Sequence, residues 1–147
     1  MKILIINGPN INMLGIREPA IYGSSTYADL CAMLSTHAAD KGVEITLYQS
    51  NHEGDLVDTI QQSLGTQDAI VINPAAYTHT SVALLDALKA VALPAVEVHI
   101  SDPDTREAFR HVSYVRSACV KTICGHGLNG YLEAIDFLID YLSEANP

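Results

Sequence analysis

The sequence predicts an α/β fold, a flavodoxin-like, doubly wound sandwich with a five-stranded parallel sheet, in a single domain over residues 1–147. Short apolar runs alternate with longer segments of helical period, which is typical of βαβ units. The first run, Lys2–Asn7, is apolar at consecutive positions, as expected for a strand covered by helices on both faces. The length suits one domain with a full core, and no repeat or linker indicates a second.

Each expected element follows from a local signal. The isoleucine- and valine-rich runs predict five strands, at Lys2–Asn7, Val43–Tyr48, Asp68–Asn73, Ala95–Ile100 and Ala118–Cys124. Ser25 or Thr26 can cap a first helix that extends to about Lys41, and Gly42 suits its end. The later helices are expected at Glu53–Leu64, Ser81–Val91 and Leu128–Leu142, with a short helical turn at Thr105–Phe109.

Composition excludes several classes of partner. A formal net charge of -9 with only 8 Lys and Arg residues argues against nucleic acid or an anionic membrane. Three cysteines form no CxxC pair, which favours a reducing compartment. The N-terminus lacks the features of a signal peptide, and no run approaches the ~18 apolar residues that span a bilayer. We therefore expect a cytoplasmic protein.

The segment Gly8–Gly23 is the expected functional loop. Loops longer than roughly 12–15 residues are uncommon in compact domains and are usually functional or disordered. This one carries enough apolar residues to pack, so we interpret it as an active-site lid or wall. It also holds Asn10, Arg17 and Tyr22.

Polar side chains gather where four of the expected strands end. In such sheets, ligands bind beyond the carboxyl ends of the strands. The polar residues at these ends include Asn7, Asn10, Ser50, Asn51, His52, Glu53, Asn73, Tyr77, Thr78, His79, Thr80, Ser81, His99, Ser101 and Asp102. A small polar ligand is the simplest explanation for four such clusters on one edge.

Each of these residues also has a structural interpretation. Asn10 and Asn73 equally fit turns or helix caps, and His79 could cap the helix that follows it. Strand alternation puts Glu97 and His99 on one face, where the carboxylate can orient the imidazole as a general acid needs, or form a structural ion pair.

Tyr22 and Arg17 suggest a base. A phenol with an ordinary pKa near ~10 becomes a usable base near neutral pH once its pKa is lowered by about two or three units. Such a shift corresponds to roughly 3–4 kcal/mol. A guanidinium at ~4 Å and an effective dielectric near 20 supplies about that much. The loop can thus produce a tyrosinate without a metal or cofactor, although a packing tyrosine and a surface arginine are the ordinary alternatives.

Several segments of the sequence resemble those of a known family. The run NGPNINMLGIREPAIYG is similar to the opening of the type II 3-dehydroquinate dehydratases, and YQSNHEGDLVDTI, INPAAYTHTSVALLDAL and PAVEVHISDPDTREAFRHVSY resemble its later blocks in order. The likeness ends with ICGHGLNGYLEAIDFL and covers nearly the whole chain.

This resemblance implies a hydro-lyase that converts 3-dehydroquinate to 3-dehydroshikimate by anti elimination through an enolate. The step belongs to the shikimate pathway of chorismate and aromatic amino acid biosynthesis, or to quinate breakdown. By the matching positions, Tyr22 takes the C2 proton, Arg17 lowers its pKa, and Asn10 helps to hold the enolate. His99, backed by Glu97, protonates the leaving hydroxyl. The implied substrate-binding residues are Asn73, His79 and Arg110, with the backbone of Ile100 and Ser101.

The resemblance also implies assembly, as a dodecamer of four trimers in which Asp86 reaches a neighbouring subunit's site. It implies no metal and no cofactor, and the His52–Glu53 pair lacks the second histidine of HExxH. The chain departs from the family at Ala76, Leu85, Asp102 and Asp104. Leu85 bears on the subunit contact, and Asp102 adds negative charge beside the expected anion site.

Two other interpretations compete with this one. A nucleotide- or flavin-binding module, or a receiver, could share the fold, because this architecture hosts many functions. The chain has no GxGxxG after its first strand, no acidic pair there and no Trp. An inactive homologue kept for assembly is disfavoured by the intact Arg17, Tyr22 and His99.

Overall fold

The computed structural model describes residues 1–16 and 18–146 and confirms the predicted α/β fold. In this part of the chain, five strands form one parallel sheet in the order β2-β1-β3-β4-β5. They are β1 (Lys2–Asn7), β2 (Glu44–Gln49), β3 (Ala69–Asn73), β4 (Ala95–His99) and β5 (Lys121–Cys124). The strand order reverses direction beside β1, between β1 and β3, and that is where such sheets bind ligands.

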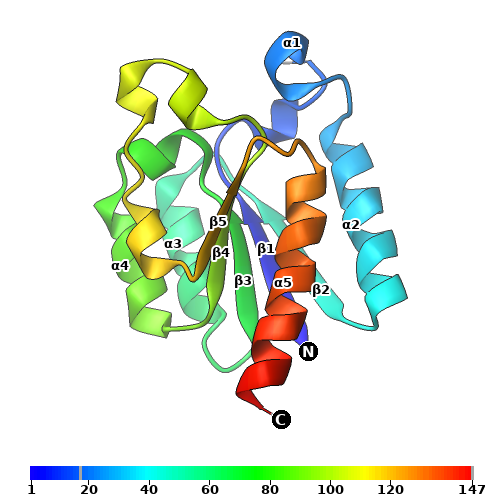
Figure 1. The fold of residues 1–147 in the computed structure, drawn as a ribbon. Helices are drawn as coiled ribbons and strands as arrows, with labels where there is room; N and C mark the ends of the chain where they lie inside the picture. The colour runs from blue at the N-terminus through cyan, green and yellow to red at the C-terminus, as the bar shows by residue number, and fades with distance from the viewer. Residues whose placement is uncertain (17, 147) are drawn as a thin grey trace.

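Helices cover both faces of the sheet (Figure 1). Helices α2 (Tyr27–Lys41) and α5 (Asn129–Ala145) pack on one face, and α3 (Glu53–Gln62) and α4 (Val82–Val91) pack on the other. Successive side chains of a strand point to opposite faces, so Ile3 and Ile5 join the first core while Leu4 and Ile6 join the second. This explains why the strand is apolar at consecutive positions.

The start of α2 matches the expected cap. The Thr26 hydroxyl accepts a hydrogen bond from the Asp29 N–H at 3.1 Å, and the Asp29 carboxylate accepts from the Thr26 N–H at 2.9 Å. This reciprocal pair is a capping box. Gly42 follows the helix in the left-handed conformation (φ 70°), as predicted.

Three expectations about local structure are wrong in detail. The fifth strand begins at Lys121 rather than Ala118, because Val115–Ala118 forms a 3₁₀ helix that buries Val115 against α4. The turn expected at Thr105–Phe109 is instead two short 3₁₀ helices, Pro103–Thr105 and Ala108–Arg110. Residues 8–23 are not a plain loop, since they contain a 3₁₀ helix at Ile11–Met13 and the short helix α1 (Pro19–Tyr22).

Gly8 brings the ends of β1 and β3 together. Its N–H donates to the Asn73 carbonyl at 2.8 Å, and a Cβ at this position would collide with the carbonyl oxygen of Pro74. Only glycine allows this close approach. The segments that leave β1 and β3 are therefore held side by side at the edge of the sheet where polar residues gather.

Candidate active site

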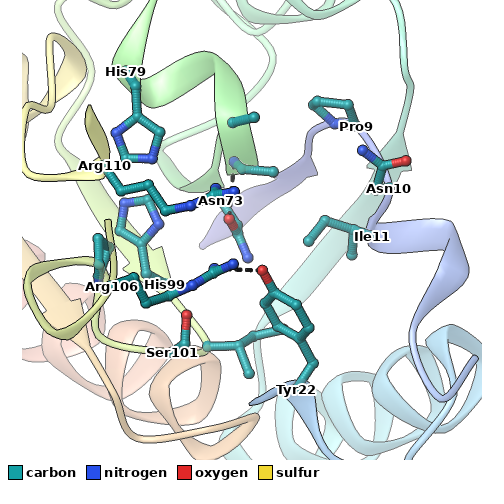
Figure 2. A pocket seen from close by; sticks show the side chains of 14 residues that line it. Pro9, Asn10, Ile11, Tyr22, Asn73, His79, His99, Ser101, Arg106 and Arg110 are labelled. Atoms are coloured by element: carbon teal, nitrogen blue, oxygen red, sulfur yellow. Dashed lines mark hydrogen bonds between the residues drawn. The ribbon is translucent and has the colours of Figure 1, made fainter. Parts of the chain in front are cut away.

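A pocket opens at the carboxyl ends of β1, β3 and β4 (Figure 2). Its lining residues are Pro9, Asn10, Ile11, Tyr22, Asn73, Ala75, Ala76, His79, His99, Ile100, Ser101, Pro103, Arg106 and Arg110. Eight of the eleven residues that the sequence put forward for the site are among them. Of the other three, Glu97 lies behind His99, Asp86 lies away from the pocket, and Arg17 falls outside the described residues.

His99 is held by the buried carboxylate of Glu97, which is fully inaccessible to solvent. The His99 Nε2 to Glu97 Oε1 distance is 2.7 Å. Because Nε2 donates to the carboxylate, Nδ1 is the ring nitrogen left for a ligand. Strand alternation predicted that these two residues share a face, and their contact confirms it.

Glu97 is charged because other groups compensate for its burial. Its Oε1 accepts hydrogen bonds from Thr78 at 2.9 Å and Ser113 at 2.6 Å, and its Oε2 accepts from Arg116 and Thr122, each at 3.1 Å. Burial raises the pKa of a carboxyl group, but the hydrogen bond and charge of His99, with the two hydroxyls on Oε1, lower the Glu97 pKa to about 2. The Glu97 carboxylate can therefore stabilise an imidazolium at His99.

Tyr22 meets an arginine that the sequence reasoning missed. Its hydroxyl accepts a hydrogen bond from Arg106 Nη1 at 2.5 Å, and the guanidinium carbon lies 5.3 Å from the ring centroid (Figure 2). A guanidinium donating to a phenolic oxygen stabilises negative charge on that oxygen. The partner that the sequence proposed, Arg17, lies outside the described residues, so its contribution stays a prediction.

His79 is fixed as a neutral hydrogen-bonding group. Its Nδ1 lies 2.7 Å from the Val112 carbonyl, which can only accept, so Nδ1 carries the proton and Nε2 has a free lone pair. Burial lowers the His79 pKa, against a smaller upward effect of the Val112 hydrogen bond. Near neutral pH its Nε2 can therefore accept a hydrogen bond from a ligand hydroxyl.

The remaining lining residues close the pocket from two sides. Asn10 adopts the left-handed conformation (φ 69°), and its N–H donates to the Asn51 side chain at 3.0 Å. Arg110 approaches from the opposite side, next to Arg106 (Figure 2). Its Nε donates to Glu107 at 2.7 Å. Two guanidiniums at one pocket wall can attract an anion in a chain whose formal net charge is -9, with Glu107 2.7 Å from Arg110 and 4.0 Å from Arg106 offsetting part of their charge.

Asp86 does not reach the pocket of its own chain. It is exposed on α4. The role that the resemblance gives it depends on a neighbouring subunit and stays a prediction.

Sequence signals for the missed residues were weak. Arg106 lies four positions before Arg110, but the irregular segment around both has no period that places their side chains. Thr78 was among the polar residues expected at the strand ends, but its contact with Glu97 was not foreseen, and Ser113 looks like an ordinary loop residue until the fold brings it onto Glu97. Among the described residues, no group of three or more His, Cys, Asp or Glu side chains is placed to hold a metal ion.

This arrangement defines a class of protein. One pocket at the edge of a doubly wound sheet contains an oriented histidine, a tyrosine hydroxyl against a guanidinium, and a pair of arginines. These are the groups that an acid–base enzyme acting on a small anion uses. The chain belongs to the class II dehydroquinase family, whose model matches residues 1–139.

Individual relatives agree with this assignment. The chain is 56% identical over 137 residues to a 3-dehydroquinate dehydratase of Corynebacterium glutamicum, covering 93% of this chain and 94% of the relative. It is 52% identical to that of Geotalea daltonii, covering 98% and 100%. The crystal structure of a type II dehydroquinase from Butyrivibrio crossotus superposes with a TM-score of 0.93 at 50% identity, covering 95% of this chain and 97% of that one.

Proposed function

We propose that this protein is a 3-dehydroquinate dehydratase, which removes water from 3-dehydroquinate to give 3-dehydroshikimate in the shikimate pathway. The observation that carries the proposal is that Tyr22 and His99 line one pocket of a class II dehydroquinase chain. Tyr22 is hydrogen-bonded there to an arginine, and His99 to a carboxylate. A base and an acid in one cleft are what an elimination needs.

Tyr22 is the base in this mechanism. Its phenolate takes a proton from C2 of the substrate, and the electron pair moves onto the C3 carbonyl to give an enolate. Arg106 supports the phenolate through the 2.5 Å contact with its oxygen. Arg17 adds a second cation in the proposal, as the resemblance implies. Asn10, at the pocket wall, helps to hold the enolate oxygen.

His99 is the acid. The enolate collapses to form the C1–C2 double bond, and the C1 hydroxyl leaves with a proton from Nδ1 of the imidazolium. Glu97 stabilises that imidazolium through the 2.7 Å contact to Nε2. The products are 3-dehydroshikimate and one water, and Tyr22 returns its proton to solvent as His99 regains one.

The other lining residues bind the substrate. Arg110 and the backbone of Ile100 and Ser101 hold its carboxylate, and all three line the pocket. His79 accepts a hydrogen bond from a substrate hydroxyl through its free Nε2, and Asn73 donates one from its side-chain amide. The reaction needs no metal or cofactor in this proposal.

Assembly and location belong to the same proposal. We propose a dodecamer of four trimers, in which Asp86 completes the site of a neighbouring subunit. Phe109, Val112 and Tyr114 support an interface next to the pocket, because their apolar side chains are 66%, 52% and 41% exposed. A cytoplasmic location is supported by the free cysteines Cys31, Cys119 and Cys124. In the described part of the chain, no helix is long and apolar enough to cross a membrane.

An absorbance assay tests the activity. The product contains a conjugated enone carboxylate, so turnover of 3-dehydroquinate raises the ultraviolet absorbance. We expect the purified protein to be active in the presence of EDTA, and Tyr22→Phe and His99→Ala to lose at least about a hundredfold in kcat. A folded, assembled wild-type protein that leaves the substrate unchanged would refute the proposal.

A further inference from the structure

A buried hydrogen-bond chain connects helix α5 to the floor of the pocket. Asn7 and Asn73 end β1 and β3, where they are register partners side by side. The hydroxyl of Tyr131, from the first turn of α5, lies between them, 2.8 Å from Asn73 Nδ2 and 2.6 Å from Asn7 Oδ1. Tyr131 is fully buried, and Asn7 and Asn73 are 1% and 3% exposed.

The glycine before this tyrosine allows the approach. A Cβ on Gly130 would lie 3.3 Å from Ile123 on β5 and 3.4 Å from Val98 on β4, so the first turn of α5 sits directly on the sheet. The tyrosine that follows can thereby reach the carboxyl ends of the central strands.

The direction of every hydrogen bond in this chain is determined. The Ala75 N–H donates to Asn73 Oδ1 at 3.1 Å, and because a backbone N–H can only donate, the oxygen end of the Asn73 amide must face Ala75. The nitrogen end then donates to Tyr131. The single hydroxyl proton of Tyr131 is left for Asn7 Oδ1. Burial raises the pKa of Tyr131, so this proton stays in place.

The hydrogen bond to Tyr131 affects the side chain that Asn73 presents to the pocket. Asn73 lines the pocket (Figure 2). One of the two amide protons on its nitrogen is donated to the Tyr131 hydroxyl. With both ends of the amide restrained, the second proton has one fixed direction. We propose that Tyr131 is a positioning residue that holds the Asn73 amide as a hydrogen-bond donor to the substrate. This inference rests on the proposed function, since Asn73 is the group through which it acts.

A purely structural role for Tyr131 makes a different prediction. The ring fills the core between α5 and the sheet, so any substitution that loosens this region would then affect activity in proportion to stability. A positioning role acts only through Asn73. The two roles separate when the same substitution is made with and without Asn73.

The test is a double-mutant cycle in 3-dehydroquinate turnover. Tyr131→Phe keeps the ring but removes the hydroxyl. We expect it to raise KM about 3- to 10-fold, the effect of one misplaced neutral hydrogen bond, with kcat changed less than about threefold. In an Asn73→Ala background, the same substitution should change KM no further. Ile135→Val, one turn along the buried side of α5, is the control for loosening of the core and should leave KM unchanged.

Three outcomes would overturn the proposal. One is an unchanged KM in Tyr131→Phe, another is an equal rise in KM in the Asn73→Ala background, and the third is an equal rise in Ile135→Val. Should Tyr131→Phe fail to fold, or the wild type show no turnover, nuclear magnetic resonance of the wild type decides. The Asn73 side-chain amide, assigned by its loss in Asn73→Ala, should show one proton protected from solvent exchange before and after addition of quinate. Two rapidly exchanging protons would refute the hydrogen bond itself.

Discussion

At the scale of single residues, the contact between Arg106 and the Tyr22 hydroxyl can be tested directly by substitution. Replacing Arg106 with Leu removes the charge that supports the phenolate, and we expect kcat to fall about 10²- to 10³-fold, a range typical for loss of one donor to a developing anion. Arg106→Lys should recover part of this loss, since it keeps the charge but not the planar fork. Steady-state kinetics at saturating substrate measure the effect. A raised KM with unchanged kcat would instead make Arg106 a binding residue only.

Two acid–base partners show what could be predicted at this scale. Glu97 was foreseen as the partner of His99, because a strand places residues two apart on one face whatever the surroundings. Arg106 was not, because its side chain is placed by two short 3₁₀ helices that follow no sequence period. Tyr131 lies in a helix and reads as a core residue, since nothing in its own segment indicates the asparagines on β1 and β3.

Strand β4 is the element on which the charge of the site depends. Its Glu97 collects hydrogen bonds from side chains on four different segments, including Thr78 before α4 and Thr122 on β5. A carboxyl group whose pKa is lower in the folded state than in the unfolded state stabilises the fold when it is ionised. The stabilisation is complete above the unfolded pKa, and it is lost as the pH falls toward the folded pKa.

This linkage predicts how acid affects stability. Because the Glu97 pKa falls from 4.5 to about 2, the difference in unfolding free energy between wild type and Glu97→Gln should shrink by about 3 kcal/mol between pH 5 and pH 2. Urea titrations across this range measure it. The exposed Glu44 provides the control, as Glu44→Gln should show no comparable change. If the difference in unfolding free energy between wild type and Glu97→Gln stayed constant over this range, the neighbours of Glu97 would not lower its pKa in the folded protein.

The elements themselves were largely predictable, and their ends less so. The continuous apolar run at Lys2–Asn7 and the cap at Thr26 predicted β1 and α2 almost to the residue. The start of β5 was wrong because residues 118–120 are apolar in sequence and continue the strand pattern, whereas Val115–Ala118 packs as a 3₁₀ helix against α4 and the strand begins only at Lys121. The start of β5 is set by tertiary packing, which cannot be inferred from the periodicity of the sequence.

At the scale of the whole molecule, the proposed role of Asp86 requires a second subunit. Asp86→Ala and Tyr22→Phe should each be inactive alone, while their co-expression should form mixed oligomers with some intact sites. With random mixing, about a quarter of the sites combine an intact Tyr22 with a neighbour's intact Asp86. We expect activity near that fraction of wild type, measured on material shown by sedimentation to be assembled. Activity no higher than that of the two variants purified apart would contradict a shared site.

In the proposed mechanism Tyr22 removes the C2 proton and His99 protonates the leaving group, and hydrogen exchange at C2 tests these two roles most directly. The measurement follows deuterium at C2 of 3-dehydroquinate in water, with wild type, Tyr22→Phe and His99→Ala. If the assignment is right, His99→Ala releases deuterium to solvent while forming little product, because the base still makes the enolate. Tyr22→Phe then does neither. Retention of deuterium by His99→Ala, with release by Tyr22→Phe, would contradict the assignment of both residues.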